Sequence, residues 1–72
     1  MYVIIFDLPH QQYVLSKSNS GNVFNILPLK YMEEARGFDS KDRAENYLKR
    51  LRSVNSGNGI ATLIGNVVRL EE

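Results

Sequence analysis

The chain of 72 residues contains no cysteine, no tryptophan and a single histidine. Without cysteine, neither a disulfide framework nor a cysteine zinc site can hold the fold together. Nine basic and eight acidic side chains leave a net charge of +1, which argues against a strongly basic nucleic-acid binder and against an acidic DNA mimic. No apolar run approaches the roughly 18 residues of a membrane span, and residues 1–8 lack the features of a signal peptide. We therefore expect a soluble, cytoplasmic protein.

The short chain also limits what the protein can enclose. A domain of this length buries only about 60% of the surface of its unfolded chain, so we expect one domain over residues 1–72 with one small core. No G-x-S-x-G motif or phosphate-binding glycine loop is present, and the serines fall in turn, strand-end or cap contexts. These observations predict a protein that is not an enzyme, with no catalytic residues and no cofactor.

Three apolar segments in the first half of the chain predict strands. Residues 2–8 form an unbroken β-branched and aromatic run with apolar side chains on both faces, which is typical of an interior strand. Residues 13–17 and 23–27 are the second and third candidates. The SNSGN segment at 18–22 predicts a hairpin between them. Pro28 closes the third strand because proline has no amide hydrogen.

The next segment, residues 29–38, fits neither the helical nor the strand period. We expect an irregular connection there, with one helical turn or a short edge strand. An amphipathic helix of three to four turns is predicted after it, capped by Asp39 or Ser40. Its apolar stripe has the i, i+3, i+4, i+7 spacing of a single buried face. The stripe consists of Ala44, Tyr47, Leu48 and Leu51.

Residues 60–70 allow two interpretations. β-branched residues and the pair Gly65-Asn66 indicate a strand or a short hairpin. Helical spacing is also kept, by Ile60, Leu63, Ile64 and Val67. A strand is favoured, because a glycine inside a helix costs about 1 kcal/mol relative to alanine. The predicted fold is therefore α+β, an antiparallel sheet with one amphipathic helix on one face and the order β-β-β-α-β.

Few residues indicate metal or phosphate chemistry. Asp7 and His10 lie three apart at the end of the first strand and could both bind a divalent metal. A turn residue and an exposed histidine are the favoured interpretation, and no metal site is predicted. The basic residues Lys49, Arg50 and Arg52 could contact phosphate, but at a helix C-terminus they more simply complement the helix dipole.

The tyrosines are the best indication of function. Three of them are less easily buried than the fourth, Tyr47, and a tyrosine on an open sheet face is a typical interface anchor. The alternative is that these tyrosines lie at the margin of the core. Together with neighbouring polar residues they form the predicted partner-binding set, which consists of Tyr2, Tyr13, Lys17, Asn25, Lys30 and Tyr31.

A resemblance to a known family also bears on the predicted function. The sequence ARGFDS at 35–40, followed by KDRAENYL at 41–48, resembles a segment of small phage-encoded proteins and is similar to that of type I-F anti-CRISPR proteins. The likeness is local to residues 35–59. It implies a non-catalytic inhibitor that occupies the nucleic-acid groove of a CRISPR surveillance complex in the bacterial cytoplasm. In that family the final segment is a second helix, whereas a strand is favoured here.

A second resemblance supports a different class of function. MYVIIFDLP at 1–9 resembles the first strand of Cas2 nucleases, which ends in a metal-binding aspartate. It implies a metal-dependent nuclease subunit with Asp7 as ligand, in a homodimer of βαββαβ order. A third possibility is a structural domain that oligomerises through an exposed edge strand.

The leading hypothesis is a small phage or mobile-element protein that binds a bacterial protein or ribonucleoprotein complex. It would inhibit this host or defence target by steric occlusion, with no membrane association and no sequence-specific nucleic-acid binding. The identity of the target and the oligomeric state are left open.

Overall fold

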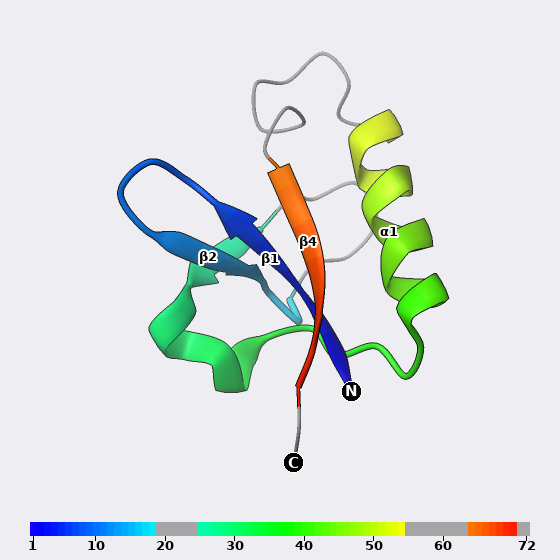
Figure 1. Cartoon of the computed structure of the whole chain (residues 1–72), viewed down its shortest axis with the longest axis horizontal. Coiled ribbons are helices and arrows are strands. Elements are labelled where there is room, and N and C mark those ends of the chain that lie inside the picture. Colours follow the sequence, from blue (N-terminus) through cyan, green and yellow to red (C-terminus); the bar gives the residue numbers. More distant parts are fainter. Residues whose placement is uncertain (19–24, 55–63, 71–72) are drawn as a thin grey trace.

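The computed structural model describes residues 1–18, 25–54 and 64–70, and its course is shown in Figure 1. The elements are β1 (Tyr2–Asp7), β2 (Gln12–Leu15), β3 (Ile26–Pro28), the 3-10 helix η1 (Leu29–Glu34), α1 (Lys41–Val54) and β4 (Ile64–Arg69). This arrangement confirms the predicted α+β class, with η1 inserted before the helix.

The strands form one antiparallel sheet in the order β3-β2-β1-β4. β1 therefore has a strand on each side, as its unbroken apolar run predicts. β2 pairs with β3 in antiparallel fashion, with Val14 opposite Leu27, which confirms the hairpin partners. The third strand is shorter than expected, since it begins at Ile26, and residues 23–24 lie outside the described part.

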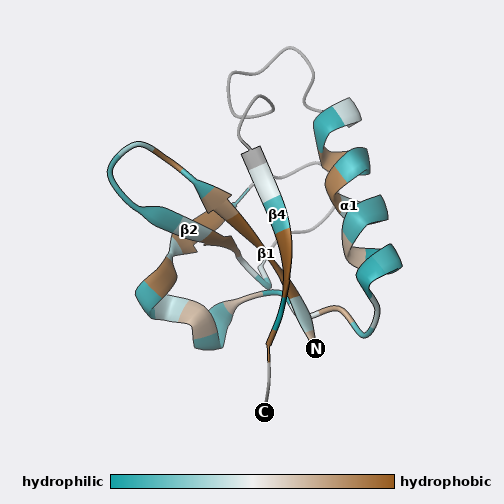
Figure 2. Cartoon of the chain, viewed as in Figure 1, coloured by the Kyte–Doolittle hydropathy of each residue, from teal (hydrophilic) through white to brown (hydrophobic). Residues whose placement is uncertain are grey.

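One face of the sheet packs against α1. Because side chains alternate along a strand, Ile4 and Phe6 point to the same face, where the apolar stripe of the helix covers them. Figure 2 shows β1 mostly hydrophobic and α1 mostly hydrophilic, apart from its buried stripe. The buried cluster consists of Ile4, Phe6, Leu15, Ala44, Leu48 and Leu51.

The opposite face is also covered at its centre. Val3 and Val14 alternate with the helix-facing residues, so they point away from α1, and both are fully buried. η1 packs against β2 and β3, and Figure 1 shows α1 on one side of the strands and η1 on the other. The expectation of an open second face is therefore wrong at the sheet centre, where Val3 and Val14 are buried, and η1 covers this face over β2 and β3.

After η1 the chain fills the gap between β1 and β2. The amide of Lys17 donates to the carbonyl of Glu34 (2.9 Å) and that of Arg36 to the carbonyl of Leu15 (2.9 Å). Two residues later, Phe38 and Tyr2 exchange both backbone hydrogen bonds, each 2.8 Å long. The predicted helical turn therefore occurs, as η1. The alternative, a short edge strand, is wrong, because Ala35 and Phe38 form only isolated bridges, to Ser16 and Tyr2, inside the sheet.

The start of α1 confirms the predicted cap and identifies Ser40, not Asp39, as the capping residue. Ser40 Oγ accepts a hydrogen bond from the amide of Arg43 (3.2 Å), which satisfies one of the unpaired amides of the first turn. Asp39 instead forms an ion pair with the Arg43 side chain, 3.5 Å apart.

Among the described residues, no helix is long and apolar enough to span a bilayer.

The last element is a single strand. Gly65 and Asn66 lie inside β4, opposite Phe6 and Ile5 of β1, so the hairpin and helix alternatives for this segment are wrong. The glycine is required because a Cβ at position 65 would lie 2.9 Å from the Phe6 ring and 3.1 Å from a Leu48 methyl group. Close packing of the helix against the sheet, rather than a turn, explains this glycine. Residues 60–63 lie outside the described part.

Candidate functional site

Two of the predicted binding tyrosines belong to the margin of the core. Tyr2 and Tyr13 are half-buried and pack against the cluster beneath α1. Strand alternation places them on the same face as Ile4 and Phe6. Of the two alternatives for these tyrosines, the margin of the core therefore holds for both, and neither stands on an open sheet face.

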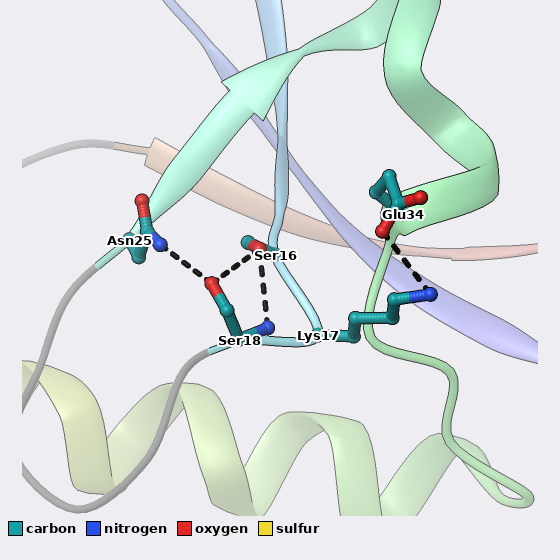
Figure 3. A network of polar contacts seen from close by, with 5 residues as sticks. All are labelled: Ser16, Lys17, Ser18, Asn25 and Glu34. Carbon is teal, nitrogen blue, oxygen red and sulfur yellow. Dashed lines mark hydrogen bonds and ion pairs between the residues drawn. The ribbon is translucent and has the colours of Figure 1, made fainter.

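Two other predicted residues lie where β2 ends and β3 begins (Figure 3). Asn25 Nδ2 donates to Ser18 Oγ (2.6 Å), which lies 2.8 Å from the buried Ser16 Oγ. Lys17 Nζ forms an ion pair with Glu34 Oε2 at 3.1 Å. This network ties the ends of β2, β3 and η1 together, so the amide of Asn25 has a structural partner already.

The remaining two predicted residues lie in η1, directly after β3. Tyr31 is 43% exposed, and the Lys30 ammonium lies 5.2 Å from the centroid of its ring. Lys30 is also exposed, so this cation and ring face solvent together. We call Lys17, Lys30, Tyr31 and Glu34 the η1 surface. Three of its four members were predicted from the sequence, and Glu34 joins them because it pairs with Lys17.

A second feature was not among the predicted binding residues. A cleft of about 440 Å³ lies between the segment after η1 and the start of α1, which is within the range of small-molecule sites. The Arg36 guanidinium carbon lies 4.6 Å from the centroid of the Tyr47 ring and 5.6 Å from that of Phe38. We call this feature the arginine cleft; it is lined by Arg36, Gly37, Phe38, Asp39, Arg43 and Tyr47.

Stacking explains the position of the arginine in this cleft. The two aromatic rings lie 5.3 Å apart at 55°, and a guanidinium is attracted to the faces of such rings. The sequence signal is the word ARGFDS at 35–40, which indicated the family resemblance and, through Asp39 and Ser40, the helix cap, but no cleft. Tyr47 could not be connected with it, because the contact between the two segments forms only when α1 packs on the sheet.

The proposed metal ligand Asp7 already has two amide partners. Its Oδ1 accepts from Gln12 Nε2 (2.6 Å) and its Oδ2 from Asn66 Nδ2 (3.2 Å). These bonds join β2, β1 and β4 across the end of the sheet. Within the described ranges no group of three or more potential metal-ligating side chains is found. The element order observed there also differs from the βαββαβ order of the nuclease alternative.

Comparison with protein-family models, with curated proteins and with solved structures finds no match to this chain. The functional assignment therefore depends on the residues and geometry described above.

Proposed function

We propose that this chain is a small phage or mobile-element protein that binds and inhibits a bacterial host or defence protein by covering part of its surface. In this respect it would act like the type I-F anti-CRISPR proteins that residues 35–59 resemble. The observation that carries the proposal is the exposed aromatic ring of Tyr31 on the η1 surface.

The chemistry of this surface suits an interface. Tyrosine offers a large apolar area and a polar tip with few rotatable bonds, so it is a common hot spot in protein interfaces. Lys30 lies over the ring, and the Lys17–Glu34 ion pair lies at the other end of η1. An aromatic centre with a charged rim is the usual anatomy of a protein–protein contact.

The polar groups elsewhere support binding over catalysis. Asp7 is held by two amides, and the hydroxyl groups of Ser16 and Ser18 bond to each other. Each of these groups links two strands or a strand and a turn. These bonds hold the groups within the fold, which supports a function that depends on the η1 surface.

Replacing Tyr31 with alanine tests the proposal. The chain is expressed in bacteria with an active type I-F CRISPR system that targets an infecting phage, and plaques are counted. The wild-type chain should restore plaques. Tyr31→Ala should bind the purified surveillance complex about 30-fold more weakly, as expected for a hot spot worth about 2 kcal/mol, and should restore fewer plaques.

The matched control is Asn46→Ala, which removes an exposed side chain from α1 on the other side of the sheet. It should bind and protect like the wild type, and circular dichroism should show both variants folded. Absence of plaque restoration by the wild-type chain would exclude the anti-CRISPR activity. Unchanged affinity of a folded Tyr31→Ala variant would exclude the η1 surface.

A further inference from the structure

The two edges of the sheet differ in how well they are protected. β3 has three residues and ends in Pro28, and short, proline-containing edge strands resist pairing with other chains. β4 has six residues, contains no proline and carries one charged side chain, Arg69. Of these two edges, that of β4 is therefore the one better suited to accept another strand.

The register identifies which backbone groups point outward from this edge. The amide of Leu70 donates to the carbonyl of Met1 (2.8 Å), so Leu70 directs its backbone toward β1. Because these directions alternate along a strand, Asn66 and Val68 also face β1, and Gly65, Val67 and Arg69 face away. Among the described residues none bonds to the outward groups of these three.

We propose that a second copy of this chain pairs with this edge, β4 against β4 in antiparallel orientation about a two-fold axis at Val67. The outward groups are symmetric about this residue, with Gly65 and Arg69 two positions away on either side. Each outward N–H would then meet an outward carbonyl of the other copy, as a two-fold symmetric interface requires. Arg69 would lie opposite Gly65 of the second copy, so the two arginines would not face each other.

The helices fit the same arrangement. α1 packs on both β1 and β4, so the two copies of α1 would lie two strand spacings apart, which is about 10 Å. Packed helices are typically 8–10 Å apart. The continuous sheet and the pair of helices therefore form without a gap between the helices or a clash.

The helix flank that would meet the second copy carries both signs of charge. Tyr47 packs against Phe38, and Phe38 pairs with β1 on the side of β1 that faces β2. The flank of α1 that carries Tyr47 therefore faces away from the β4 edge. The opposite flank carries Lys41, Glu45 and Arg52 at helical spacing. Since the two helices would run antiparallel, acidic and basic groups of the two copies can face each other. This dimer goes beyond the proposed inhibitory function and does not depend on it.

The first measurement is the mass of the full chain in solution, by light scattering and sedimentation over a wide range of protein concentration. The expected result is a species of twice the 8.2 kDa of one chain, which dissociates on dilution. A monomer at every concentration would overturn the proposal.

Amide hydrogen exchange identifies the surface that dimerises. In the proposed dimer the amides of Gly65, Val67 and Arg69 are protected along with those of Asn66 and Val68. In a monomer, or in a dimer formed through another surface, protection alternates along β4. An alternating pattern in a sample with the mass of a dimer would therefore exclude the β4 edge.

Arg69→Pro and Arg69→Ala form a matched pair of variants. Proline removes an outward N–H and places its ring where the second copy would lie, but removes no hydrogen bond to β1. Alanine removes the side chain and keeps that N–H. Arg69→Pro should be a folded monomer and Arg69→Ala a dimer. If a folded Arg69→Pro variant dimerises as tightly as Arg69→Ala, the proposed pairing is wrong.

Discussion

At the scale of single residues, two glycines lie where a side chain would meet a neighbour. Gly65 lies between Phe6 and Leu48, and an added Cβ would approach both, at 2.9 and 3.1 Å. Gly37 lies against Met1, whose sulfur an added Cβ would overlap. The difference is in what can move, because Phe6 is buried in the core and Met1 is 48% exposed.

Gly65→Ala should therefore destabilise the protein more than Gly37→Ala. Overpacking of a rigid core costs about 1–3 kcal/mol, whereas a flexible, exposed methionine side chain can rotate away. Urea unfolding followed by circular dichroism measures both free energies. If both variants lost the same free energy of unfolding, the extra Cβ at position 65 would be accommodated by a movement of the helix that costs no stability.

At the scale of elements, the helix start is the best example of a local signal. Ser40 caps α1 through its hydroxyl oxygen, and Asp42 lies in the first turn and Arg52 in the last, each of the sign that the helix dipole favours. These features depend on residues close together in the sequence. Propensity and spacing were therefore sufficient to place this element.

Ser40→Ala should lower the free energy of unfolding by about 1 kcal/mol, because the amide of Arg43 loses its acceptor. The control is Ser53→Ala, which removes an exposed hydroxyl from the last turn of the same helix and should change the stability by less than about 0.5 kcal/mol. Thermal and urea unfolding provide the comparison. A Ser40→Ala variant as stable as Ser53→Ala would show that water replaces the cap fully.

At the scale of the whole molecule, stability depends on one small core. A chain of 72 residues is expected to have about 4–11 kcal/mol of total stability. Phe6 is 1% exposed and is one of the largest fully buried side chains. It contacts both the helix-facing cluster and the region around Gly65, so it joins α1 to β1 and β4.

Phe6→Ala should remove about 3–5 kcal/mol, which is a large part of that total, and should lower the melting temperature strongly. Phe38→Ala is the comparison, since Phe38 is only partly buried at the margin of the same cluster. This substitution should reduce the free energy of unfolding by less than Phe6→Ala does. Far-ultraviolet circular dichroism reports the folded fraction of each. A Phe6→Ala variant that keeps the full wild-type signal and melting temperature would contradict this account of the core.

The sequence alone was sufficient for the elements whose signals are local. β1 was recognised by its β-branched run, and α1 by its cap and apolar spacing, because each pattern reflects the geometry of one segment. For the segment at 29–38 the pattern allowed one helical turn or a short edge strand, and the structure has the helical element, η1. The stop at Pro28 was also visible, since the missing amide is a property of that residue alone.

Only the tertiary structure decided which surfaces stay exposed. Tyr2, Tyr13 and Tyr31 are the same residue type in similar sequence surroundings, yet the first two pack against the buried cluster and the third is exposed on η1. Likewise Arg36 meets Tyr47 only after the helix packs on the sheet. Burial is a sum over contacts between segments distant in the chain, so no local pattern could determine it.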